Sequence, residues 1–389
     1  MTNDFSLDLG PDALADIPEP TQVAGIEDAF DHPVGFKLGI VGVGQAGGRI
    51  AFTFYEQGYR RVCAVNTASA DLAELDVLSD KQKLLVGDQQ GAGKDPSAAA
   101  KMIADSGEDL YDLFTRSFGD DVDYILVCFS AAGGTGAGAY PAVVKAAKRY
   151  MREKKRPNKV GCVIALPKDS EGQRGARNVL LSMDHLTKLN VSPIIFIDNE
   201  RFKVMYGDRI AASKEKQLSN VSTVKVLHTF NRLAGTESED VGGTTFDPAD
   251  FARVLDSGVV AFASAALKNW QDPTEITSAI RDKLKNNVLA SVDLTQGTVA
   301  GLLYVVSGEA WDGDNPVTIS HLDSGTEMMN RLLTADNAAV FPGVYPAAGP
   351  AQLSILSMVG GLPLPQKRLQ SLFERSGLEK DKVAAHLLG

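Results

Sequence analysis

The sequence predicts an α/β protein with a Rossmann-like parallel sheet and helices on both faces, then one long central helix, then a second, smaller α+β domain. Three observations support this prediction. Short apolar runs without alternation recur between amphipathic stretches, which is typical of strands buried on both faces. Two glycine-rich segments, at 42–48 and 130–138, each follow such a run. A glycine-containing break at 235–243 separates the long helix from a further set of elements.

The expected elements follow from these runs in chain order. The first strands are predicted at Leu38–Val43, Val62–Val65, Leu84–Val86, Tyr124–Phe129, Val160–Leu166 and Ile194–Ile197. Helix-like stretches between them include Tyr140–Arg152 and Arg177–Leu189, and we expect Pro141 in the first turn of the former. Residues 216–234 can form the long helix. Beyond it we expect helices at Phe251–Trp270 and Glu275–Leu289, and strands at Gly301–Val306, Ala338–Phe341 and Leu353–Met358.

The chain divides into four predicted segments. Residues 1–34 form an acidic arm, 35–215 the sheet domain, 216–245 the long helix with its connecting loop, and 246–389 the second domain. The formal net charge of −10 is concentrated in the arm, because every charged residue before Lys37 is acidic. The arm is also poor in periodic apolar positions, so we expect it to be flexible or to dock elsewhere.

Composition and charge exclude several classes of protein. The chain lacks the basic excess of a nonspecific nucleic-acid binder, so we expect no nucleic-acid partner. No apolar stretch reaches the roughly 18 residues of a transmembrane helix, and the opening Met-Thr-Asn-Asp lacks the basic segment of a secretory signal. Cys63, Cys128 and Cys162 lie in apolar runs without metal-ligand spacing, which favours buried thiols in the reducing cytoplasm.

The two glycine-rich segments carry the first chemical signal. Glycines after a buried strand let backbone N–H groups approach a phosphate, and the following helix N-terminus attracts negative charge. The segment Gly42–Gly48 alone fits a dinucleotide-binding unit or a plain tight turn. The segment Ser130–Gly138 repeats the arrangement in the same domain, and its Thr135 hydroxyl can donate to a phosphate or lie near a metal-bound water. Together they favour a site for a nucleotide phosphate.

Gly133-Gly134-Thr135-Gly136-Ala137-Gly138 resembles the signature loop of the tubulin/FtsZ superfamily of filament-forming GTPases. Four further segments are similar to that family's nucleotide loops and follow in its order, at 64–72, 91–96, 166–172 and 197–200. The first loop, with Gly44-Gln45-Ala46-Gly47-Gly48, is similar to the archaeal tubulin-like proteins of the CetZ type. The match continues past residue 360, so it covers nearly everything after the arm.

The resemblance implies that the chain binds GTP and GDP with Mg²⁺, and it assigns no metal-binding side chain. It places the terminal phosphate at Gly91–Gly93, the ribose at Glu171 and the base at Asn199 and Asn220. Arg49 stands where FtsZ usually has Asn. Asn220 is open to a second interpretation, as an exposed residue at a helix start. The implied nucleotide-binding residues are Gly44, Gln45, Ala46, Gly47, Arg49, Asn66, Gly91, Ala92, Gly93, Ala132, Gly133, Gly134, Thr135, Gly136, Glu171, Asn199 and Asn220.

Asp247 and Asp250 have two compatible interpretations. In the first they begin a helix, with Asp247 as the N-cap and Pro248 at the first helical position. In the second, which the resemblance implies, both are catalytic acids that reach the nucleotide of the next subunit and orient an attacking water. The active site is then complete only between two copies. Such a head-to-tail contact does not close on itself, so it extends into a homopolymer filament.

Other functions remain open on the sequence. A nucleotide-binding scaffold with weak hydrolysis is one, because Thr245 replaces a frequent Asn and Ala131 and Ala132 replace frequent glycines of the family. An NAD(P)-dependent oxidoreductase is another, although it expects an acid after the second strand where the chain has Asn66. The basic run at 145–159 is a solvated helix face or a docking site for the acidic arm.

Overall fold

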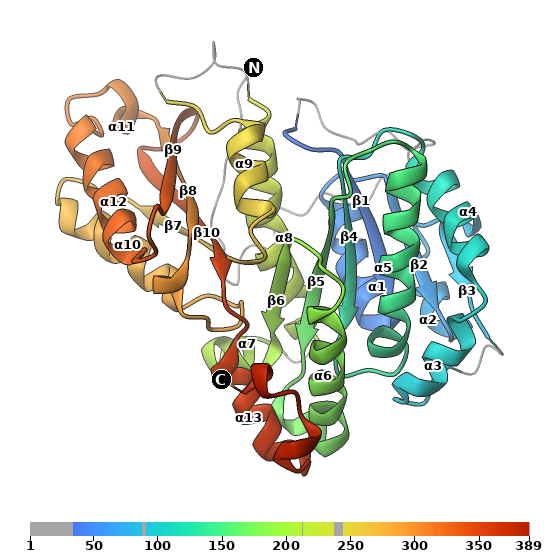
Figure 1. Cartoon of the computed structure of the whole chain (residues 1–389). Coiled ribbons are helices and arrows are strands. Elements are labelled where there is room, and N and C mark those ends of the chain that lie inside the picture. Colours follow the sequence, from blue (N-terminus) through green and yellow to red (C-terminus); the bar gives the residue numbers. More distant parts are fainter. Residues whose placement is uncertain (1–33, 88–90, 212, 237–243, 389) are drawn as a thin grey trace. The chain divides into compact units, whose positions relative to one another are not determined.

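The computed structural model describes residues 34–87, 91–211, 213–236 and 244–388 (Figure 1). These residues form two compact units. The first unit contains residues 36–224 and 364–388, and the second contains residues 34–35 and 225–363. The last described residues therefore belong to the first unit, although we expected 246–389 to form one segment. The acidic arm, apart from Val34, lies outside the described residues.

The first unit is built on six parallel strands in the order β3-β2-β1-β4-β5-β6. All residues of β1, β2 and β5 are buried, which confirms strands covered on both faces. The predicted strands are confirmed to within one or two residues. They are β1 (Leu38–Val43), β2 (Val62–Asn66), β3 (Lys83–Leu85), β4 (Tyr124–Ser130), β5 (Val160–Leu166) and β6 (Ile194–Asp198).

Helices alternate with these strands, as the pattern predicts for a parallel sheet (Figure 1). They are α1 (Gly44–Glu56), α2 (Ser69–Ala73), α3 (Pro96–Ile103), α4 (Gly107–Phe118), α5 (Thr135–Glu153), α6 (Gly172–Thr187) and α7 (Asn199–Tyr206), with α13 (Gln366–Ser376) added from the chain end. The long helix is confirmed as α8 (Glu215–Ala234). Because the strands are parallel, the loops that follow them gather at one edge of the sheet.

The second unit has four strands in the order β7-β10-β8-β9. β10 is antiparallel to both of its neighbours, whereas β8 and β9 are parallel. The strands are β7 (Val259–Leu267), β8 (Val299–Ser307), β9 (Ala339–Ala347) and β10 (Gln352–Leu362), and the helices are α9 (Pro248–Leu255), α10 (Pro273–Lys285), α11 (Glu309–Asp312) and α12 (Ile319–Leu332).

Two predictions about helices are wrong. The expected helix Phe251–Trp270 is helix α9 followed by strand β7, because Gly258 adopts φ +99° and ends the helical path. The apolar run after Gly258 has no clear period, and pairing with β10 makes it a strand. Pro141 lies inside α5 rather than in its first turn, because the glycine-rich signature itself forms that turn from Thr135.

Candidate functional site

Six loops follow the strands of the first unit at the carboxyl edge of the sheet. We number them by the order of the sequence segments that predicted them. Loop 1 is residues 42–48, loop 2 is 64–72, loop 3 is 91–96, loop 4 is 130–138, loop 5 is 166–172 and loop 6 is 197–200.

Loops 1 and 4 are in backbone contact. Gly44 has φ +71°, and a Cβ there would lie 3.0 Å from the amide nitrogen of Gly136. A Cβ at Gly47 would lie 2.1 Å from the carbonyl oxygen of Cys128, in the strand that leads into loop 4. Only glycine permits these approaches. The two glycine-rich loops predicted to share one site are therefore adjacent.

Loops 2 and 3 join the same cluster. The hydroxyls of Thr67 and Thr135 are 2.7 Å apart, which connects loop 2 to loop 4. The Gly91 amide donates to the Thr67 carbonyl at 3.0 Å, which connects loop 3 to loop 2. A Cβ at Gly134 would lie 3.0 Å from the Cβ of Ala92, so loops 3 and 4 touch as well. The structure thus brings together four of the predicted phosphate loops.

Asp71 orients two of the predicted binding residues. Its carboxylate accepts from Gln45 Nε2 at 3.1 Å and from Asn66 Nδ2 at 3.0 Å. The Asn66 Oδ1 in turn accepts from the Thr67 amide at 2.8 Å. Arg49, in contrast, lies on α1, where it is partly exposed. Its guanidinium forms an ion pair with the Glu74 carboxylate at 3.1 Å.

Asn178 on α6 anchors loop 4 and was not among the predicted site residues. Its Nδ2 donates to the carbonyls of Ala132 at 3.0 Å and Gly133 at 3.4 Å in loop 4. It also donates to the Lys94 carbonyl of loop 3 at 3.2 Å. Asn178 is 5% exposed. Asparagine is common in helices, and the partners of Asn178 lie more than forty positions away in the chain. The sequence alone therefore does not reveal that Asn178 anchors a loop.

Replacing Asn178 with Ala should loosen loops 3 and 4 together. We expect the free energy of unfolding to fall by about 1–3 kcal/mol, because the buried carbonyls lose their donor. Thermal denaturation of Asn178→Ala against the native protein measures this. Thr187→Ala, on the exposed end of the same helix, is the control. An unchanged melting temperature for Asn178→Ala would contradict the anchoring role.

Loops 5 and 6 lie beside α8. Glu171 Oε1 accepts from the Lys168 amide at 2.9 Å, closing the turn of loop 5. Asn199 begins α7, and its Oδ1 lies 3.5 Å from the Ser219 hydroxyl of α8. Asn220, the next residue, is only 8% exposed and lies in the second turn of α8. The interpretation of Asn220 as an exposed helix start is therefore wrong, and the two predicted base-binding asparagines belong to adjoining segments.

The acid pair begins α9 in the second unit. Asp247 is the N-cap, its Oδ1 accepts from the Asp250 amide at 2.9 Å, and Pro248 occupies the first turn. The helix-start interpretation is confirmed, and it fixes both carboxylates at one helix end. Burial and then the Asp247 charge raise the pKa of Asp250, while Arg253 acts to lower it.

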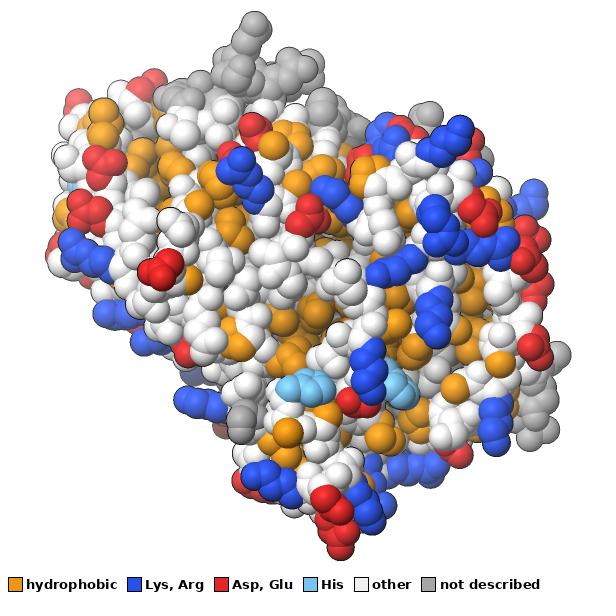
Figure 2. Space-filling model, in the orientation of Figure 1, with side chains coloured by type: hydrophobic (Ala, Val, Ile, Leu, Met, Phe, Trp, Pro, Cys, Tyr) orange, Lys and Arg blue, Asp and Glu red, His pale blue; other side chains and the backbone are white. Residues whose placement is uncertain are grey.

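The basic run on α5 is largely paired within its own unit. Figure 2 shows blue and red side chains intermingled over α4 and α5. Arg149 pairs with Glu108 at 2.6 Å, Lys154 pairs with Asp120, and Arg156 pairs with Asp123 at 2.6 Å. Lys148 donates to the Leu189 carbonyl at 2.6 Å. These contacts support the interpretation of a solvated helix face.

Two further features concern residues 34–87, 91–211, 213–236 and 244–388. In this part of the chain, no group of three or more His, Cys, Asp or Glu side chains is arranged to hold a metal ion. Among the same residues, no helix has the length and apolar character needed to cross a membrane.

The chain is similar to known proteins of one family. Residues 37–207 match the family model for the GTPase domain of the tubulin/FtsZ family. The tubulin-like protein CetZ of Thermococcus kodakarensis is 31% identical over 221 residues, covering 56% of this chain and 55% of that protein. The CetZ of Pyrococcus abyssi is 24% identical over 330 residues, covering 83% and 85%.

A solved structure shows the same fold. A GTPγS-bound protofilament of CetZ2 from Haloferax volcanii matches with a TM-score of 0.70 and 20% identity, covering 87% of this chain and 97% of that one. The predicted α/β fold with its parallel sheet is confirmed. These comparisons give the oxidoreductase alternative no support.

Proposed function

Residues 37–207 of this chain belong to the tubulin/FtsZ family of GTPase domains, and from that premise we propose that the protein binds and hydrolyses GTP and assembles head to tail into filaments. The observation that carries the proposal is the convergence of loops 1 to 4, whose glycines leave backbone amides available to phosphates. The CetZ2 relative was solved as a GTPγS-bound protofilament, which supports both the nucleotide and the assembly.

We propose the residue roles that the resemblance to the family implies, and the clustering of the loops supports them. Loops 1 and 4 hold the phosphates, and Gly91, Ala92 and Gly93 of loop 3 lie near the terminal one. Glu171 binds the ribose, and Asn199 and Asn220 read the base, because an amide offers guanine both a donor and an acceptor. Arg49 contacts the ribose or base only if it leaves Glu74.

Mg²⁺ fits this donor set only as a partner of the nucleotide. Mg²⁺ commonly takes one or two protein oxygens, phosphate oxygens and waters, and the described residues contain no larger cluster of ligating side chains. The Thr135 hydroxyl in loop 4 is the protein oxygen we place nearest to it. When bound, the ion neutralises triphosphate charge and polarises the terminal phosphate.

Hydrolysis is completed by a second copy. The rigid helix start of α9 carries Asp247 and Asp250, and we propose that these acids reach the nucleotide of the neighbouring subunit. There Asp250 accepts a proton from the attacking water, and Asp247 holds the helix end in place. Loss of the terminal phosphate near loop 3 then weakens the junction between subunits.

Phosphate release measured against protein concentration tests this proposal. Activity that rises more steeply than linearly with concentration indicates a shared site, and electron microscopy with GTP and with GDP shows whether filaments form. Tight GTP binding without turnover would favour the scaffold alternative. An absence of GTP binding would reject both.

Asp247→Asn should shift the acid side of the pH–activity profile to lower pH. Asn caps a helix about as well as Asp, so α9 stays intact. Removing the Asp247 charge lowers the pKa of Asp250, so Asp250 stays deprotonated at a lower pH. GTP turnover measured from pH 4.5 to 8 at saturating GTP gives the two profiles. If the acid limb lies at the same pH in both proteins, Asp250 is not the group that accepts the proton.

Docking of the acidic arm on the basic run, and a cytoplasmic location, stay proposals. Residues 1–33 lie outside the described residues. Because most of the run is paired locally, docking would have to use Lys145, Arg152 and Lys155 or displace existing partners. Deleting residues 1–33 and comparing assembly at low and high salt tests the docking, which predicts a difference that salt abolishes.

A further inference from the structure

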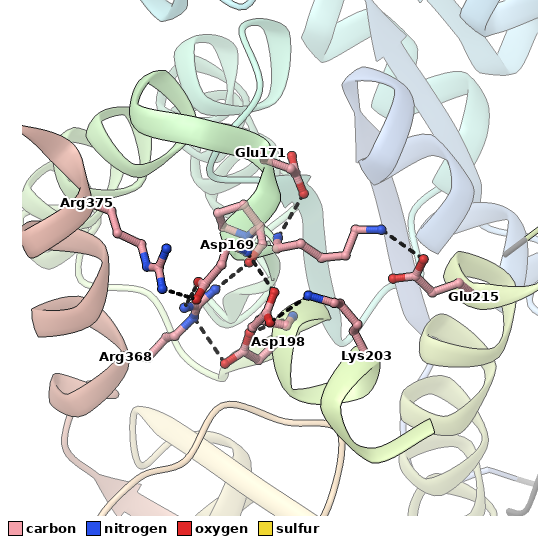
Figure 3. Close-up of polar contacts among 10 residues, drawn as sticks. Asp169, Glu171, Asp198, Lys203, Glu215, Arg368 and Arg375 are labelled. Atoms are coloured by element: carbon pink, nitrogen blue, oxygen red, sulfur yellow. Dashed lines mark hydrogen bonds and ion pairs between the residues drawn. The ribbon is translucent and has the colours of Figure 1, made fainter. Parts of the chain in front are cut away.

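The C-terminal helix α13 carries a buried arginine that joins two loops of the candidate site. Arg368 Nη1 donates to Asp169 Oδ1 of loop 5 at 2.7 Å, and its Nη2 donates to the Pro167 carbonyl of the same loop at 2.5 Å. Its Nε lies 3.3 Å from Asp198 Oδ2 of loop 6. The Arg368 side chain is 9% exposed. Figure 3 shows this guanidinium between the two loops, with its contacts marked.

Further contacts extend this group, which we call the Arg368 cluster (Arg368, Arg375, Asp169 and Asp198). Arg375, about two turns further along α13 on the same face, pairs with Asp169 Oδ2 at 2.7 Å. Asp198 also caps α7 by accepting from the Glu200 amide at 3.1 Å. The Asp169 amide donates to Glu200 at 2.8 Å, so loops 5 and 6 are joined directly as well.

The two acids of the cluster lie next to residues that we propose bind the nucleotide. Asp169 lies two residues before Glu171, and Asp198 immediately precedes Asn199, so each acid is next to a proposed ribose or base contact. Arg368 is 199 residues from Asp169. No local preference of loops 5 and 6 supplies this arginine; it comes from the packing of α13 on α6, where Arg177 also donates to the Ser376 carbonyl at 2.6 Å.

A buried guanidinium that donates to Asp169 and Pro167 and forms an ion pair with Asp198 does more than neutralise charge. Its planar fork fixes the directions of the groups it binds, whereas a lysine ammonium does not. If Arg368 is removed, Asp198, which is 5% exposed, loses its main counter-ion and becomes an uncompensated buried acid. We therefore expect loops 5 and 6 to rearrange, and Glu171 and Asn199 to move with them.

We propose that Arg368 is a positioning residue that holds loops 5 and 6 in their nucleotide-binding arrangement, so that docking of the C-terminal helix and nucleotide binding stabilise each other. This inference rests on the proposed function for the identity of the ligand, GTP or GDP. The coupling is reciprocal by linkage: α13 raises nucleotide affinity, and bound nucleotide strengthens the docking of α13.

The experiment compares Arg368→Met, Arg368→Lys and Lys367→Met with the native chain. Lys367 is the exposed neighbour on α13, so its variant is a matched control for loss of charge. We expect the dissociation constant for GDP to rise about tenfold in Arg368→Met, less in Arg368→Lys, and not in Lys367→Met. The KM for GTP should rise while kcat at saturating GTP and high protein concentration stays near the native value.

Hydrogen exchange supplies a readout that a merely structural role would not move. In the native chain, GDP should slow amide exchange across residues 366–376, and in Arg368→Met this effect of GDP should disappear. Should Arg368→Met fold poorly, the pair Arg368→Met with Asp198→Asn removes both buried charges, keeps a capping side chain on α7, and should show the same loss of affinity.

The possible outcomes separate the two proposals. Equal GDP affinity and equal GDP-dependent protection in native and Arg368→Met proteins overturn the positioning role while leaving the proposed function intact. If the native chain itself binds no GDP, the proposed function fails. Exchange at residues 166–172 and 197–200 without nucleotide then decides whether Arg368 orders the loops: faster exchange in Arg368→Met supports it, and unchanged exchange rejects it.

Discussion

Asp250→Ala should slow GTP turnover by about 100-fold or more, since a positioned general base contributes roughly 10²–10⁴-fold. GTP binding should be unchanged, because the variant's own loops 1 to 6 are intact. Filaments should last longer, because the junction weakens only after the terminal phosphate has left. Phosphate release and sedimentation of the polymer measure the two effects on the same sample.

Asp250 is a cleaner position for this test than Asp247. Asp247 caps α9, so its replacement by Ala would cost about 1 kcal/mol of helix stability in addition to any catalytic effect. Asp282→Ala, which removes an exposed carboxylate from α10 in the same unit, is the matched control. A collapse of nucleotide affinity in Asp250→Ala would show that the residue acts on its own subunit rather than on its neighbour.

A mixture of subunits sharpens the same test. Chains with Gly133→Val, whose added side chain enters loop 4, should bind nucleotide poorly but keep their acids, whereas Asp250→Ala chains bind nucleotide but lack one acid. If the acids act on the neighbour, mixing the two inactive variants should restore part of the native turnover. Activity that stays at the level of either variant alone would contradict catalysis between subunits.

Gly133→Val should weaken GTP binding strongly without unfolding the protein. A Cβ at Gly133 has only the Ser130 carbonyl oxygen near it, at 4.0 Å, so the added methyls project into the open space of loop 4. Its φ is outside the left-handed region, so a valine meets no backbone strain there. Filling a space that a phosphate needs costs about 1–3 kcal/mol or more, so we expect affinity to fall roughly 10- to 100-fold at least.

The other glycines of loop 4 are poor tests of phosphate binding. A Cβ at Gly134 would lie 2.8 Å from the Asp95 amide, and one at Gly136 would lie 2.8 Å from the Ser130 carbonyl. Substitutions there disturb the packing of the loops themselves. Gly107→Val at the start of α4, where a Cβ also meets open space, is the control. Native GTP affinity in Gly133→Val would contradict the assignment of loop 4 to the phosphates.

Much of the first unit follows from local features of the chain. Buried parallel strands read as uninterrupted apolar runs, and β1 and β5 begin and end where those runs do. Glycines after β1 and β4 predict loops whose backbone a ligand can approach closely. Because the strands are parallel, these loops lie at the same edge of the sheet. Acid–proline spacing predicts the start of α9.

The sequence was less informative where two structures satisfy the same pattern. The segment from Phe251 to Trp270 has apolar residues compatible with a helix or a strand, and only pairing with β10 makes Val259–Leu267 a strand. Asn220 likewise could face solvent or the interior, and the packing of α8 decides that it is buried.

The sequence by itself determined where the strands of the first unit lie along the chain, the six loops and the resemblance to the tubulin/FtsZ family, because these depend on residues close together in the chain. Tertiary structure alone decided which side chains hold those loops in place. Asn178 reaches loops 3 and 4 from α6, and Arg368 reaches loops 5 and 6 from the far end of the chain. Such contacts form between segments brought together by packing, and a sequence pattern records only neighbours along the backbone.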